Sequence, residues 1–184
     1  MRASKTRKIA VCGVMGALCL TVLLLGGVIP CATFCAPALS GVLILLVSAH
    51  CGVKYALLLY LAVALLAFLL VPDIEMSCIF AALLGYYPLL RGLFERVGPP
   101  WLRWPLKLAF FNAVVLALYS LLGLLWPVLT ADIAAGGAWF TALLLVLGNI
   151  TFILYDLSLL SLQRLFRARL RKLSAGRSGR RPTR

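Results

Sequence analysis

LLVPDIEMSC, residues 69–78, is the stretch that decides the fold, because it places Asp73 and Glu75 between two long apolar runs. A carboxylate at the centre of a bilayer costs about 2.5–3.5 kcal/mol on insertion scales, so two of them would weaken any membrane-spanning helix. Pro72 also interrupts the helical pattern here, because proline lacks the N–H that a helix interior needs. The stretch therefore predicts a loop exposed to water, with one helix ending before it and another beginning after it.

The composition of the chain favours lipid over water as the surrounding solvent. Hydrophobic residues make up 64% of the 184 residues, and the mean hydropathy is +1.07. Soluble domains are about 45–50% apolar, so a core of this size could not hide so many apolar side chains from water. The net charge of +13 would suggest nucleic acid in a soluble protein, but here the positions of the charges matter more than their sum.

Six apolar segments are candidates for membrane-spanning helices. They cover residues 9–29, 34–49, 55–71, 76–90, 108–125 and 138–162. About 20 apolar residues are needed to cross the hydrocarbon, so the second and fourth segments are short and would borrow polar flanks or thin the bilayer. The first segment is too long for the apolar region of a signal peptide, and we expect it to be retained as a helix.

The basic residues predict the orientation of these segments. All 18 Lys and Arg lie in 1–8, 50–54, 91–107 or the tail from 164 onward. The alternate connections, 30–33, 72–75 and 126–137, contain no basic residue, although they contain Asp73, Glu75 and Asp132. Because cytoplasmic loops carry the excess of Lys and Arg, we predict an all-α polytopic membrane protein with six transmembrane helices and both termini cytoplasmic.

The predicted domains are a basic cytoplasmic N-terminus over 1–8, a transmembrane domain over 9–163 and a cytoplasmic tail over 164–184. In the tail, leucines and one phenylalanine recur at helical spacing between arginines up to Leu173, which is typical of a basic amphipathic helix at a membrane surface. Residues 174–184 have the composition of a disordered segment. We expect the tail to bind anionic lipid and not nucleic acid.

Four polar residues within the last two apolar segments are candidates for contacts between helices. Asn112 and Tyr119 share one helical face, as do Asn149 and Asp156, because each pair is seven residues apart. At about 1.5 Å per residue, counted from the nearest basic residue, Asn112 lies level with Asp156 and Tyr119 with Asn149. We therefore predict two intramembrane polar rungs, Asn112–Asp156 and Tyr119–Asn149.

Two interpretations of these rungs stay open: hydrogen bonds that hold helices together, or part of a proton or substrate pathway. Lys107 or Arg103 could neutralise Asp156 from the cytoplasmic side. No Lys or Arg is expected at the depth of Asp156 itself, which argues against a stand-alone proton-driven pump.

Small residues line one face of the first apolar segment: Ala10, Gly13, Gly16 and Ala17. Such a face lets another helix approach closely. The partner could be another helix of this chain or a separate membrane subunit. In the fourth segment, Pro88 predicts a kink or a helix end, and Tyr86 and Tyr87 would anchor the inner membrane interface.

The sequence contains no motif of a known catalytic or metal centre. The cysteines and His50 are scattered without ligand spacing, although Cys31 and Cys35 are close enough for a possible disulfide. Phosphate-binding, nucleophile-elbow and zinc-protease motifs are absent. We therefore expect no metal, no cofactor and no enzyme activity.

The architecture resembles a known family of transport subunits. Six helices over residues 5–165, cytoplasmic ends and the GxxxA pattern at Gly13–Ala17 are similar to the S component of energy-coupling-factor transporters, whose usual motif has alanine in place of the glycine. The stretches VPDIE and FAALLGYYPLLR also look similar to membrane proteins of this general kind.

This resemblance implies a subunit of a bacterial cell membrane that binds a small solute, such as a vitamin or a metal, near the outer face. A transmembrane coupling subunit and two cytoplasmic ATPases would then drive its release inward. The nearest candidates for solute contacts are Thr33, Phe34, Asp73, Glu75, Tyr119, Trp139 and Asn149. The two acidic residues would suit a cationic or amine-bearing solute, unless they are simply solvated loop residues.

A non-transport role is the main alternative. A small polytopic protein with short loops could also be a scaffold subunit of an envelope or cell-shape complex. Co-purification distinguishes the two, because each predicts different partners.

Overall fold

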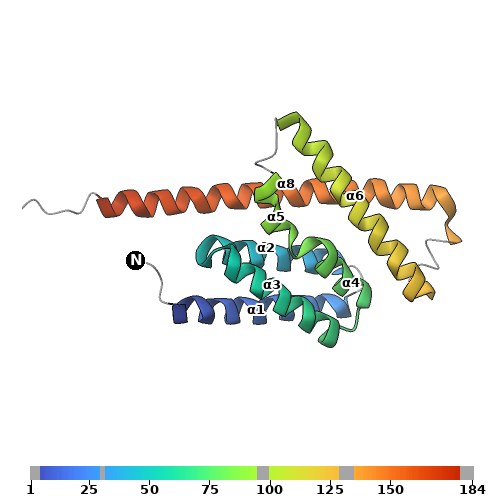
Figure 1. Cartoon of the computed structure of the whole chain (residues 1–184), viewed down its shortest axis with the longest axis horizontal. Helices are drawn as coiled ribbons and strands as arrows, with labels where there is room; N and C mark the ends of the chain where they lie inside the picture. The colour runs from blue at the N-terminus through green and yellow to red at the C-terminus, as the bar shows by residue number, and fades with distance from the viewer. Residues whose placement is uncertain (1–4, 30–31, 95–99, 129–134, 179–184) are drawn as a thin grey trace, which may run out of the picture.

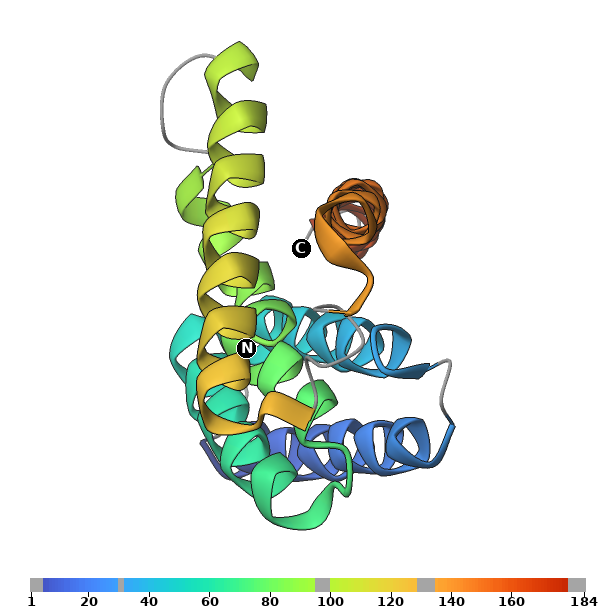
Figure 2. The same ribbon diagram turned by 90° about the vertical axis from the view of Figure 1, so that its right-hand side faces the viewer.

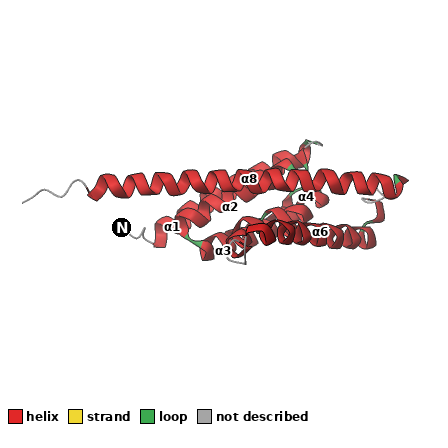
Figure 3. Cartoon of the chain, turned by 90° about the horizontal axis from the view of Figure 1, so that it is seen from above, coloured by secondary structure: helices red, strands yellow, loops and turns green. Residues whose placement is uncertain are grey.

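The computed structural model describes residues 5–29, 32–94, 100–128 and 135–178, and within these ranges it is helical without any strand (Figure 3). Its elements are α1 (Lys5–Val28), α2 (Cys35–Cys51), α3 (Val53–Leu70), α4 (Ile74–Ile79), the π-helix η2 (Phe80–Leu84), α5 (Tyr87–Phe94), α6 (Pro100–Leu125) and α8 (Gly137–Ser178). The prediction of an all-α fold is confirmed for these residues.

Among the described residues, five stretches are long and apolar enough to cross a membrane: Lys5–Val28, Val53–Leu70, Ile74–Gly92, Arg103–Leu125 and Gly137–Leu165. The remaining predicted segment, 34–49, forms α2, an apolar helix of 17 residues. These helices are compatible with a lipid bilayer, because their backbone groups are bonded within each helix.

Stacked helices form the core of the fold. Helix α2 lies between α1 and α8, while α3 packs on α1 and α2 (Figures 1 and 2). Helix α6 runs obliquely across α8 (Figure 1). The C-terminal end of α8 extends beyond the rest of the bundle in the same view.

Close approach of small residues holds α1, α2 and α3 together. A Cβ added to Gly16 would lie 2.8 Å from Leu59 Cδ1 on α3, and one added to Gly26 would overlap the Cβ of Ala36 on α2. Cys19 and Leu23 of α1 are fully buried in the same core. Small residues therefore let these helices pack at short range, as in other membrane bundles.

The connection between α2 and α3 is a single residue. Gly52 has φ of +102°, a conformation that side-chain-bearing residues rarely adopt. The predicted cytoplasmic segment 50–54 is therefore helical except at Gly52. Similarly, 91–107 is not one loop, because α5 continues to Phe94 and α6 begins at Pro100.

The stretch at 69–78 separates two helices, as its sequence predicts. Helix α3 ends at Leu70, and Asp73 begins α4 by accepting a hydrogen bond from the Met76 backbone N–H at 3.1 Å. Glu75 occupies the first turn of α4, where the positive end of the helix dipole favours a carboxylate. Both acidic side chains are half-buried, so they are less solvated than predicted.

The fourth predicted segment is interrupted, and tyrosine hydroxyls donate hydrogen bonds to the backbone carbonyls that lose their helical partners there. Pro88 has no N–H for the carbonyl of Leu84, which accepts a hydrogen bond from the Tyr155 hydroxyl of α8 at 3.1 Å instead. In η2 the Gly85 N–H bonds to Phe80 O at 2.8 Å, five residues back. This shift leaves Ala81 O to accept from the Tyr60 hydroxyl at 2.6 Å.

Helix α8 continues without a break from Gly137 to Ser178. The backbone therefore confirms that the last apolar segment extends into the tail as a helix. Residues 174–178, predicted to be disordered, belong to this helix, while 179–184 lie outside the described residues.

Candidate functional site

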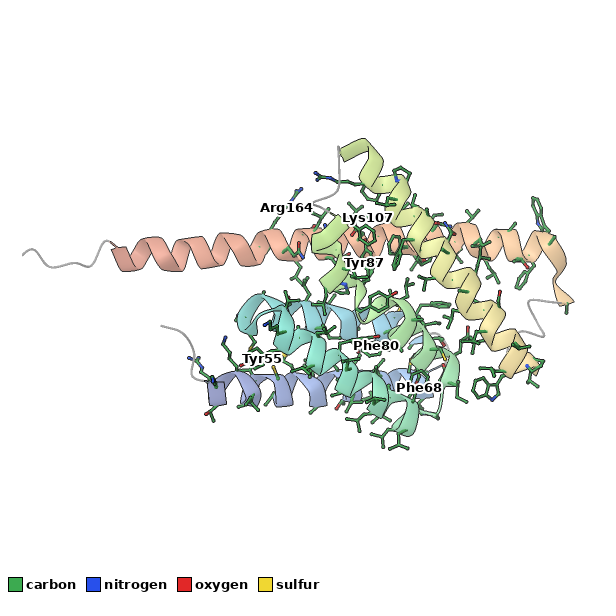
Figure 4. All side chains as sticks on the ribbon, viewed as in Figure 1. Tyr55, Phe68, Phe80, Tyr87, Lys107 and Arg164 are labelled. Carbon is green, nitrogen blue, oxygen red and sulfur yellow. The ribbon has the colours of Figure 1, made fainter. Side chains whose placement is uncertain are left out.

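A buried charged cluster joins α5, α6 and α8 at Asp156. The Asp156 carboxylate lies 2.9 Å from Arg91 Nε and 2.9 Å from Lys107 Nζ. It also accepts a hydrogen bond from the Tyr87 hydroxyl at 2.6 Å. Tyr87 and Lys107 are labelled in Figure 4, where both lie close to α8. We call these four residues the Asp156 cluster.

Burial makes every member of the Asp156 cluster dependent on the others. Asp156 and Arg91 are completely buried, and Lys107 is 5% exposed. Removing an ion from water costs several kcal/mol, which close ion pairs with additional hydrogen bonds can offset. Lys107 also lies over the Trp104 ring, with its Nζ 5.6 Å from the ring centroid.

The predicted neutralisation of Asp156 by Lys107 is confirmed, but the expectation that no Lys or Arg lies level with Asp156 is wrong, because Lys107 and Arg91 both contact its carboxylate. Arg91 was expected in a cytoplasmic segment and Tyr87 at the membrane interface, yet both are buried against Asp156. Tyr87 and Arg91 are four residues apart and so share one face of α5. That spacing was the signal in the sequence that could have identified them as partners of one carboxylate.

An amide pair links α6 to α8 further along the two helices. Asn112 Nδ2 donates to Asn149 Oδ1 at 3.0 Å, and Asn149 Nδ2 donates to Asn112 Oδ1 at 2.9 Å. Each amide also donates to its own helix, Asn112 to Leu108 O and Asn149 to Leu145 O. The predicted rungs therefore have the wrong partners: Asn112 pairs with Asn149 and not with Asp156.

Tyr119 pairs with Glu75 and not with Asn149. Its hydroxyl donates to Glu75 Oε1 at 2.7 Å, which joins α6 to the beginning of α4. Nearby, the Thr33 hydroxyl donates to Asp73 Oδ2 at 3.4 Å. The two acidic residues predicted to receive a cationic solute thus already have partners within the chain.

A cavity of about 400 Å³ lies between α2, α4–η2, α6 and α8. Its wall is mostly apolar and includes Leu83 of η2, Phe111 and Val115 of α6, and Leu144 and Gly148 of α8. No Lys, Arg, His, Asp or Glu lines it among the residues that the structure describes.

The structure brings two of the seven predicted solute contacts to this cavity, Phe34 and Tyr119. Thr33, Asp73, Glu75 and Asn149 do not line it, although Glu75 is bonded to Tyr119. Trp139 is 85% exposed and also lies outside the wall. The prediction missed most of the wall, because apolar side chains that line a cavity look identical in sequence to those that fill a core.

The small-residue face of α1 is divided between two environments. Gly16 is buried against α3, whereas Ala10, Gly13 and Ala17 are exposed. No atom lies within 4 Å of a Cβ added at Gly13. Internal packing thus accounts for Gly16 alone.

Within the described part of the chain, no group of three His, Cys, Asp or Glu side chains could hold a metal ion. Cys35 is a free thiol, and its suggested partner Cys31 lies outside the described residues, as does Asp132.

Because comparison with known proteins finds no match, the functional assignment rests on the geometry of the chain. No family model, no curated protein and no solved structure matches this chain.

Proposed function

We propose that this chain is a membrane-embedded solute-binding subunit, similar to the S component of an energy-coupling-factor importer, with six transmembrane helices and cytoplasmic termini. The cavity between α2, α4–η2, α6 and α8 carries the proposal. Its volume of about 400 Å³ lies within the range of roughly 300–1,000 Å³ that small-molecule sites occupy. Such sites commonly form between the helices of a bundle.

Contacts at the two ends of the bundle support the orientation. Lys8 Nζ donates to Cys51 O at 3.4 Å, so the basic beginning of α1 lies beside the α2–α3 connection. Thr33 bonds to Asp73, which brings together two of the three connections without basic residues. We assign the first end to the cytoplasm because cytoplasmic loops carry more Lys and Arg.

In this proposal the exposed small residues of α1 receive the coupling subunit. Ala10, Gly13 and Ala17 project from the bundle and offer a surface on which another helix can pack closely. The chain itself would hydrolyse nothing, and two cytoplasmic ATPases bound to the coupling subunit would supply the energy.

Affinity purification from native membranes tests this assignment. The full chain should carry a transmembrane coupling protein and ATPases, and Gly13→Leu should reduce their recovery at least about tenfold by blocking close helix approach. Ala62→Leu is the matched control, because Ala62 is exposed on α3. Recovery of neither protein with the native chain would contradict the proposal.

Native mass spectrometry of the purified chain tests solute binding directly. A small molecule should accompany the native chain and be absent from a variant whose cavity is filled. A chain that carries no solute and retains its partners after Gly13→Leu would not be an S component.

The scaffold alternative has one observation in its favour. Helix α8 runs past the bundle (Figure 1) into a tail rich in arginine, where it could contact other proteins. Recovery of wall-synthesis or cytoskeletal proteins in the same purification would select this alternative.

A further inference from the structure

We propose that the cavity selects uncharged, largely apolar molecules that carry a hydrogen-bond donor such as a hydroxyl or N–H, and that it rejects anions. This inference rests on the proposed function, because it takes the cavity to be the solute site. It infers the chemistry of the solute from the hydrogen bonds that the wall residues already make within the chain.

Four residues of the described wall carry a hydroxyl group, and each of these hydroxyls already donates its hydrogen within the chain. Tyr119 donates to Glu75 Oε1 at 2.7 Å, and Tyr155 donates to Leu84 O at 3.1 Å. Thr141 donates to Gly137 O at 3.1 Å, and Thr151 donates to Leu147 O at 2.9 Å. A hydroxyl that has donated its only hydrogen can still accept through its oxygen.

The wall is therefore able to accept hydrogen bonds but holds no hydroxyl hydrogen in reserve. A carboxylate or phosphate needs donors or cations, and the described wall supplies no charged side chain. Burying such an anion without partners is strongly unfavourable. A hydroxyl or N–H on the solute could instead donate to an oxygen of the wall.

Glu75 strengthens this preference at the Tyr119 side. Its carboxylate accepts from the Tyr119 hydroxyl, so a negative charge lies directly behind one polar atom of the wall. A solute anion near Tyr119 would be repelled, whereas a donor hydrogen would be attracted. Most of the remaining wall is apolar and would contact the body of the solute.

Three naphthalene compounds with the same ring test the inference: naphthalene-1-methanol, 1-naphthoate and 1-methylnaphthalene. Binding is measured at pH 7 by ring fluorescence with the full chain in nanodiscs, and empty nanodiscs give the partition into lipid. The alcohol should bind saturably and at least about tenfold more tightly than the carboxylate. The methyl compound should bind less tightly than the alcohol, because it has no donor.

Gly148→Phe places a ring in the cavity, because Gly148 lies in the wall and an added Cβ has its nearest neighbour at 3.6 Å, on Phe111. It should abolish saturable binding, as should Val115→Phe, a second filling variant from α6. Leu65→Phe is the control, since Leu65 is 73% exposed on α3 and should bind like the native chain.

Equal or tighter binding of the carboxylate would overturn the inference, and so would saturable binding that both filling variants retain. Native mass spectrometry distinguishes failure of this inference from failure of the proposed function. If native mass spectrometry finds an anionic solute that Gly148→Phe removes, the solute-binding role stands and the selectivity falls. A lipid molecule in its place would overturn both.

Discussion

The helices at the two ends of the chain are held together by different interactions. Helices α1, α2 and α3 pack through small and apolar residues, with Gly16 and Gly26 at the closest approaches. Helices α6 and α8 are linked by the Asp156 cluster and the Asn112–Asn149 pair, with a cavity alongside. We call these the apolar region and the polar region.

The difference shows how a bundle of apolar helices can be closely packed in one part and hollow in another. Lipid competes equally well for apolar side chains, so helices that associate through them must fit closely. Polar groups can hold two helices at a few positions and leave space elsewhere. A cavity is thus compatible with the polar region, where directional bonds fix α8, and not with the close packing of α1–α3.

Loss of the Asp156 carboxylate should lower the stability of the protein more than any other change considered for the two regions. Asp156→Asn removes the negative charge between two buried cations, and we expect the free energy of unfolding to fall by about 3–5 kcal/mol. Equilibrium unfolding in mixed micelles measures this change. Asp73→Asn is the control, because asparagine caps a helix as well as aspartate does. A loss below about 1 kcal/mol for Asp156→Asn would show that the polar region does not depend on the cluster.

A single methyl group should disturb the apolar region. The Cβ of Gly26→Ala would overlap Ala36, so we expect a loss of about 1–3 kcal/mol in the same unfolding measurement. Gly13→Ala on the same helix meets open space and should not destabilise the protein. Equal stability of the two variants would mean that α1 and α2 do not pack as closely as the structure shows.

The amide pair should make a smaller contribution than the ionic cluster. A double-mutant cycle with Asn112→Ala and Asn149→Ala should give a coupling energy of about 0.6–1.7 kcal/mol, the range for polar contacts between membrane helices. The cycle with Asn112→Ala and Thr151→Ala serves as the control, because Thr151 bonds only to its own helix at Leu147 O. Additive effects of the two asparagine variants would indicate that the pair is formed without stabilising the protein.

A polar contact that borders the apolar region should matter least. Thr33→Val removes a hydrogen bond of 3.4 Å to Asp73, and we expect a loss of about 0.5 kcal/mol. Thr21→Val, whose hydroxyl bonds to its own helix at Ala17 O, gives the reference. A loss above about 2 kcal/mol for Thr33→Val would remove the contrast, because the apolar region would then also depend on a polar link.

Hydropathy and charge were sufficient to predict where the helices lie. The interruption at Pro72 and Asp73 falls between α3 and α4, and Pro88 accounts for the break that follows η2. These features depend on local chemistry, since proline lacks an N–H and a carboxylate caps a helix.

The partners of the polar side chains could not be predicted in the same way. The depth estimate counted α6 from Lys107 as the inner boundary, but Lys107 lies beside Asp156. Asn112 is five residues from Lys107 along α6 and Asn149 is seven residues from Asp156 along α8, so these two amides come level and pair. Arg91 was assigned to water because it is charged, although a buried carboxylate can hold it.

The length of α8 connects the Asp156 cluster to a distant point. The helix continues 22 residues from Asp156 to Ser178, a span of about 33 Å at 1.5 Å per residue. A rotation of about 10° around the cluster would displace the Ser178 end by about 6 Å. Small adjustments around one buried carboxylate would therefore be magnified several-fold along the length of α8.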